Sequence, residues 1–220
     1  MKKLFFLLFF VGLCVAFVFL LASPRKSLLL SAMPAPAVPE LTDGLRQPNA
    51  EVFAKKVAEA AAYSSKRGLN GEVAILIDLS LHSGSSRFFV VRLADGSVRL
   101  KGLVTHGSGK RGLLPGERKY SNEEGSLLSS LGKYKTGVSY NGQFGLAYKL
   151  HGLEVSNSQA YRRFIVLHAH ECVPDAETDE LICQSWGCPT VSPDFLRQLQ
   201  QVIDGSTKPL LLWIYDSGLQ

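Results

Sequence analysis

The sequence lacks the patterns that mark nucleic-acid readers and repeat proteins. Its 220 residues carry a formal net charge of +5, from 24 basic and 19 acidic side chains. These charges form no dense cluster of lysine and arginine and no basic stripe interleaved with aromatic residues, and no internal repeat is visible. We therefore expect no nucleic-acid partner. The modest positive charge favours an anionic surface such as a cell wall or a membrane.

The sequence also lacks a true phosphate-binding loop, although residues 107–110 read GSGK. Arg111 stands where such a loop requires Ser or Thr after the lysine, and the spacing of the glycines differs from the motif. We therefore expect no nucleotide and no other cofactor.

Apolar residues are concentrated at the start of the chain. Lys2 and Lys3 precede an uninterrupted apolar run, Leu4–Ala22. Its length of ~19 residues is close to what a helix needs to cross a bilayer. The run predicts a signal anchor over residues 1–22, with a cleaved signal peptide as the alternative. Everything after it would then be exported to the periplasmic or cell-envelope face and tethered to the inner membrane.

A linker and a folded domain follow this segment. Residues 23–48 contain five of the ten prolines, which is typical of a stiff, extended tether. Residues 49–220 form the predicted domain, with 46% hydrophobic residues in the whole chain to supply a core. Asn49 is placed to cap a helix that runs through about residue 66 and ends at Gly68.

The rest of the domain is rich in predicted strands. Residues 107–145, rich in Gly, Ser, Asn and Lys, read as a surface loop. Ser192 and Pro193 begin a second helix. The predicted class is mainly β, or α+β, with a few flanking helices, and its strands are 73–80, 87–93, 98–106, 145–150, 163–170 and 209–215.

Two histidines lie near the end of the strand predicted at 163–170. Side chains alternate along a strand, so His168 and His170 share one face with Phe164 and Val166. A histidine on an apolar face costs desolvation free energy unless it finds a polar partner. Both residues are candidates for a catalytic base, and hydrogen-bonded structural histidines are the alternative interpretation.

Three cysteines lie in the exported part of the chain, and an odd number leaves one thiol unpaired. Cys188 follows Gly187 in the segment SWGCP, which suits a tight turn. A free thiol needs a base or a cation nearby to become a nucleophile. Backbone N–H groups of the same turn could stabilise an oxyanion. A zinc site and a buried or disulfide-bonded structural cysteine are the alternatives; the zinc ligands would be His168, His170, Cys172, Cys183 and Cys188.

These residues stand in a wider pattern: LIDLS, VTHGSG, YSNEEGSLLSSLGKY, GLAYKLHGLE, RFIVLHAH and SWGCPTVSP, in this order from about residue 75 to residue 193. The pattern resembles the L,D-transpeptidase (YkuD-like) catalytic domains, in the branch where Gly-Cys is followed by Pro. The resemblance implies an L,D-transpeptidase-like β-sheet domain in which Cys188 is the acyl-accepting nucleophile and His168 its base. Ser185 and Gly187 would shape the turn and the oxyanion site, with His170 as the alternative base.

The implied reaction is acyl transfer between peptidoglycan stem peptides through a thioester on Cys188. L,D-carboxypeptidase activity on the same substrate and a non-catalytic wall-binding module are the alternatives. Many family members have an arginine soon after the Gly-Cys pair, where this chain has Pro189 and Thr190. Arg162, Arg163 and Lys149 are the possible substitutes for its contact with a substrate carboxylate.

The loop ECVPDAETDELIC, residues 171–183, departs from the family pattern. Its two cysteines bracket an acidic segment in an exported domain, which suggests a disulfide between Cys172 and Cys183. Cys188 would then keep its free thiol.

Overall fold

The computed structural model describes residues 47–219. The predicted anchor at 1–22 and nearly all of the linker at 23–48 lie outside the described residues, and both stay predictions. Across residues 47–219, no helix has the length and apolar character needed to cross a membrane.

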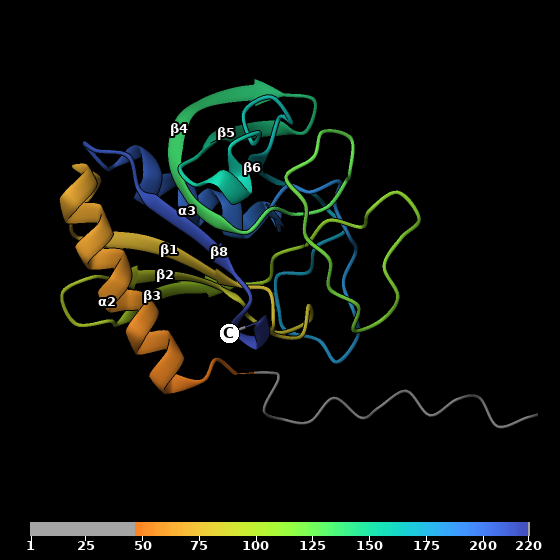
Figure 1. Cartoon of the computed structure of the whole chain (residues 1–220), viewed down its shortest axis with the longest axis horizontal. Coiled ribbons are helices and arrows are strands. Elements are labelled where there is room, and N and C mark those ends of the chain that lie inside the picture. Colours follow the sequence, from red (N-terminus) through yellow and green to blue (C-terminus); the bar gives the residue numbers. More distant parts are fainter. Residues whose placement is uncertain (1–46, 220) are drawn as a thin grey trace, which may run out of the picture. The chain divides into compact units, whose positions relative to one another are not determined.

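The described chain is built around one mixed sheet, with strand order β3-β2-β1-β8-β4-β5-β6-β7 (Figure 1). The β1–β8 and β6–β7 pairs are parallel, and the other neighbours are antiparallel. This architecture confirms the α+β class. The strands are β1 (Val73–Asp78), β2 (Phe88–Arg92), β3 (Val98–Gly102), β4 (Gly132–Gly142), β5 (Gly145–Gly152), β6 (Val166–Ala169), β7 (Thr190–Val191) and β8 (Leu211–Tyr215).

Two α-helices cover opposite faces of this sheet. Helix α2 (Ala50–Arg67) begins at Asn49, whose side-chain oxygen accepts the N–H groups of Glu51 and Val52, and it ends at Gly68 with φ 65°. Helix α3 (Pro193–Asp204) begins at Ser192, as predicted. Alternate residues of β1 point to the two layers, because Ala74 and Leu76 pack in the cluster with α2 while Ile75 and Ile77 pack in the cluster with α3. Two short 3₁₀ helices, Val155–Asn157 and Ser217–Leu219, complete the secondary structure.

The prediction of a loop over the whole of residues 107–145 was wrong in its last third. Residues Gly132–Gly142 form β4, the longest strand, which pairs with β8 on one side and β5 on the other. Tyr134 and Thr136 are buried, whereas Lys133 and Lys135, which alternate with them, are only partly buried. The alternation that defines a half-buried strand is therefore present, but its outward positions are lysines. The composition of the segment hid this alternation.

The strand predicted at 163–170 is shorter than expected. Phe164 has a left-handed backbone with φ 54°, and the N–H of Ile165 donates to the carbonyl of Ala160 at 2.9 Å. A bulky side chain in this conformation interrupts a strand. β6 therefore covers only Val166–Ala169, and Phe164 does not share its pleat with His168.

A disulfide closes the long connection between β6 and β7. Cys172 and Cys183 are bonded to each other with a Cα–Cα distance of 6.1 Å. Ile182, beside the bridge, packs with Leu103 and Val173 in a small separate apolar cluster. The predicted pairing is confirmed, and the loop that leads to Cys188 is tied down at its base.

Replacing Cys172 and Cys183 together by Ser should lower the free energy of unfolding of the full-length protein by about 3 kcal/mol, because the reduced chain regains the entropy of a loop whose ends are 11 residues apart. Denaturant unfolding without reductant measures the change. A reductant should destabilise the wild-type protein and leave the double variant unchanged. Equal stability of both proteins without reductant would contradict this.

Candidate active site

The parallel pairing of β6 and β7 brings the predicted site residues together. In its register His168 is opposite Thr190, two residues after Cys188. The Thr190 hydroxyl oxygen lies 3.0 Å from Nε2 of His168 and 3.5 Å from the carbonyl oxygen of Cys188. One hydroxyl group therefore lies between the histidine and the cysteine segment.

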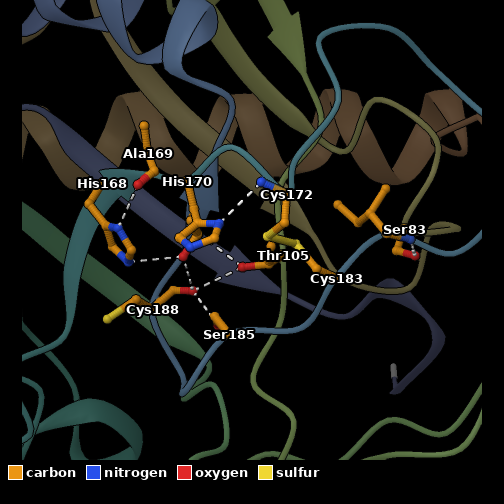
Figure 2. The surroundings of a disulfide bond; sticks show 11 residues. Ser83, Thr105, His168, Ala169, His170, Cys172, Cys183, Ser185 and Cys188 are labelled. Carbon is orange, nitrogen blue, oxygen red and sulfur yellow. Dashed lines mark hydrogen bonds between the residues drawn. A yellow bond between two sulfur atoms is a disulfide. The ribbon is translucent and has the colours of Figure 1, made fainter. Parts of the chain in front are cut away.

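The turn that carries Cys188 is fixed by its own polar groups. The Ser185 hydroxyl accepts the N–H of Gly187 at 3.2 Å and donates to the carbonyl of Cys188 at 2.7 Å. Thr105 donates to the same carbonyl at 3.3 Å (Figure 2). Within residues 47–219 the N–H of Cys188 donates to no acceptor. It is thus a backbone donor of this turn that is available to a ligand.

The backbone conformation at position 187 and its close contact with residue 128 both require a glycine there. Its φ is 108°, and a Cβ at this position would lie 2.7 Å from the carbonyl oxygen of Leu128. Any larger residue would strain the backbone and push this carbonyl away. The glycine of the SWGCP segment therefore allows the turn to lie against residues 128 and 129.

The thiol of Cys188 is the free sulfhydryl of the described chain. It is partly buried and donates to the carbonyl of Phe164 at 3.6 Å. Burial raises its pKa above the ordinary value, while the N–H of Val166 and the charge of Arg163 act in the opposite direction. Cys188 is consequently a neutral thiol at neutral pH and needs a base to react.

His168 has the properties of a neutral base. Its side chain is buried, with Nδ1 3.0 Å from the carbonyl oxygen of Ala169. A carbonyl only accepts, so this contact assigns the ring proton to Nδ1 and leaves a lone pair on Nε2. Burial is the main cause that lowers the pKa of His168 below its ordinary value. The ring is therefore unprotonated at neutral pH.

Phe144 covers this histidine from the turn between β4 and β5. Its ring stacks on His168 with centroids 5.0 Å apart and contacts His170 edge-on at 5.9 Å. His170 itself is exposed, and its Nδ1 accepts the N–H of Cys172 at 3.1 Å (Figure 2). The two histidines share a face, as expected, but only His168 is enclosed.

The zinc alternative loses two of its ligands to the disulfide, because Cys172 and Cys183 are bonded to each other. No group of three or more His, Cys, Asp or Glu side chains in the described part of the chain is arranged to hold a metal ion.

The three candidate cations for a substrate carboxylate have other partners. Arg163 donates to the carbonyls of Ser121 and Leu128 at 2.7 and 2.6 Å, so it braces the loop that supports Gly187. Arg162 pairs with an exposed glutamate, and Lys149 lies over two tyrosine rings. Sequence reasoning missed the contacts of Thr190 and Phe144, which are made across strands and leave no local motif.

Comparison with known proteins identifies the family. A family model described as the L,D-transpeptidase catalytic domain matches residues 45–215. Among solved structures, the helical cell shape determining protein Pgp2 (K307A mutant) of Campylobacter jejuni is similar, with 14% identity, a TM-score of 0.42, and coverage of 66% of this chain and 47% of that one. Bdellovibrio bacteriovorus Bd1075 is similar with 16% identity, a TM-score of 0.43, and coverage of 68% and 49%. This chain thus spans about half the length of these structures. A search of curated proteins found no significant match.

Replacing Phe144 by Ala should raise the pKa of His168 towards its ordinary value of 6.5, because burial is what lowers it and the phenyl ring covers the imidazole. NMR titration of the histidine ring signals in the full-length protein in detergent measures the shift. Tyr161→Ala is the matched control: Tyr161 stacks on His151 at 5.3 Å, so only the His151 signal should move. An unchanged or lower pKa of His168 in the Phe144 variant would refute the covering role.

Proposed function

Because the chain belongs to the L,D-transpeptidase catalytic-domain family, we propose that it is a cysteine-dependent enzyme of peptidoglycan, and specifically an L,D-transpeptidase acting on stem peptides. The observation that carries this proposal is the position of Cys188. It is the free cysteine of the described residues, it follows Gly187 with its positive φ, and it comes two residues before the Thr190 that pairs with the enclosed His168.

In the proposed reaction Sγ of Cys188 attacks the carbonyl carbon between a diamino acid and a terminal D-alanine. His168 takes the thiol proton on Nε2 and then gives it to the departing amine of D-alanine as the C–N bond breaks. The product is a thioester on Cys188. An acceptor amine resolves it in transpeptidation and a water molecule in carboxypeptidation, so both activities share this first half.

The electrostatics favour proton transfer during the attack over a preformed ion pair. Burial raises the pKa of Cys188 and lowers that of His168, so both groups are neutral at neutral pH. The thiol donates to the carbonyl of Phe164 in this structure, and we propose that bound substrate displaces it towards His168. Hydrogen bonds between catalytic groups commonly tighten only in the substrate complex.

The turn supplies a donor for the negative charge that develops on the substrate oxygen. The N–H of Cys188 is available, whereas the N–H of Gly187 is engaged by the Ser185 hydroxyl. We assign the Cys188 N–H to the oxyanion and Ser185 to holding the turn in place. An exported domain tethered by residues 1–22 would carry this site to the peptidoglycan side of the inner membrane.

His168→Ala should slow acylation at least ~10²-fold, the low end for general base catalysis, while His170→Ala should have a smaller effect because its ring is exposed and its Nδ1 already accepts the N–H of Cys172. The full-length protein in detergent is incubated with tetrapeptide muropeptides, and D-alanine release and products are measured by mass spectrometry. The acylation rate of the wild-type protein should also rise with pH through an inflection below 6.5, since only neutral His168 accepts the thiol proton.

Cys188→Ala is the control and should release no D-alanine. A reversed order of the two histidine variants would reassign the base to His170. Cross-linked dimers among the products identify transpeptidation, and tripeptides alone identify carboxypeptidation. D-alanine release by the Cys188 variant would reject the proposed nucleophile.

A further inference from the structure

A pocket lies beside the segment that leads to the Cys188 turn. It has a volume of about 220 Å³, and its walls include Leu81, Arg87, His106, Leu114, Arg118 and Gln184. Cys188 and His168 do not line it. The pocket could hold a group of the size of one amino acid, and the mechanism proposed above does not use it.

Arg87 places a buried positive charge in the wall of this pocket. Its side chain is 2% exposed, and its guanidinium donates to the carbonyls of Val104 at 2.7 and 2.9 Å and Leu81 at 3.2 Å. It forms no ion pair with a carboxylate of residues 47–219. Tyr120 and Asp78 act on its charge from a longer distance, and the Asp78 carboxylate accepts the hydroxyl and N–H of Ser217.

Burying a cation without a contacting anion costs desolvation free energy, and hydrogen bonds to carbonyl groups offset only part of that cost. Burial accordingly lowers the pKa of Arg87 to about 10. Two other charges of the wall have ion-pair partners, since Arg118 pairs with Asp216 at 3.3 Å and Glu117 pairs with Lys119. Arg87 has no such partner among residues 47–219, and the negative charge of the buried Asp78 acts on it from a longer distance.

The polar neighbours of Arg87 present further donors. A guanidinium cannot accept a hydrogen bond, so Nδ1 of His106, 3.0 Å from Arg87, must be the acceptor of this pair. The neutral ring then carries its proton on Nε2, and burial lowers the pKa of His106 to about 4, which keeps the ring neutral. Nε2 of His106 therefore faces the pocket side as a donor.

Gln184 opposes this donor with a second one. Its amide nitrogen lies 3.4 Å from Nε2 of His106 and donates to the carbonyl of Leu113, while its amide oxygen accepts the Leu113 N–H. Turning the amide over would place its oxygen against the Leu113 carbonyl. Two N–H groups thus converge with no acceptor between them, next to the buried guanidinium of Arg87.

We infer that this pocket is a binding site for a carboxylate, which would accept the converging N–H groups of His106 and Gln184 and lie beside the buried guanidinium of Arg87. The assignment of a source rests on the proposed function. Peptidoglycan chemistry offers two: a carboxylate of the stem peptide itself, or the free D-alanine that the reaction releases. Gln184 directly precedes Ser185, so an occupant would contact the segment that holds the nucleophile.

The test measures binding in the absence of turnover. The full-length protein with Cys188→Ala, in detergent, is melted with acetate, D-alanine, D-alaninamide and the tetrapeptide, against chloride at equal ionic strength. A carboxylate at ten times its Kd should raise the melting temperature by about 3 °C, and D-alaninamide should not. A greater stabilisation by the tetrapeptide than by D-alanine, if Gln184→Glu abolishes the difference, identifies the stem peptide as the source, and equal stabilisation identifies the free amino acid.

Gln184→Glu provides the decisive variant, because it removes one of the two N–H donors and places a tethered carboxylate beside the other, on His106. It should abolish the response to acetate and D-alanine. Gln198→Glu, which adds the same charge on the exposed side of α3, should keep the full response. No stabilisation of the parent protein by any carboxylate, or a Gln184→Glu variant that still responds to acetate and D-alanine, would overturn the inference. Neither result depends on whether Cys188 forms a thioester.

Discussion

The short parallel pairing of β6 and β7 is the constraint on which the site depends. It consists of only two residue pairs, His168 with Thr190 and Ala169 with Val191. Yet it sets the histidine beside the cysteine turn and directs Nε2 towards the Thr190 hydroxyl. β7 is too short to hold this register alone. Hydrogen bonds around Ser185 and Thr105 also tie the turn to the segment after β3. These bonds stabilise the register in the way that a longer strand pairing would.

The same arrangement leaves one of the three cysteines of the described residues unpaired. The disulfide closes the acidic loop before the turn and leaves Cys188 as the free thiol of the described residues. Burial then keeps this thiol protonated, and burial also keeps His168 unprotonated. Under the proposed mechanism, the proton moves from the thiol to the histidine only when a substrate brings the two groups together. The pocket lined by Arg87 and His106 borders the same segment through Gln184.

Sequence reasoning succeeded where a single local signal decides the structure. Asn49 and Ser192 marked both helices, and the apolar run at 209–215 marked β8. It failed for β4, where lysines occupy the outward positions, and for Phe164, whose left-handed backbone is imposed by the preceding turn. Within the site, the motif located Cys188 and His168, but the contacts that hold them come from distant strands. The facing N–H groups of His106 and Gln184 also come from distant segments, so no local sequence motif marks them.

The most direct test of the account is covalent trapping of the thiol. The full-length protein, kept without reductant, is treated with a carbapenem and mapped by peptide mass spectrometry. The account predicts one adduct in the exported domain, on Cys188, and a peptide in which Cys172 remains bonded to Cys183. Cys188 found in a disulfide, or left unmodified while the protein is folded, would contradict the assignment of Cys188 as the nucleophile.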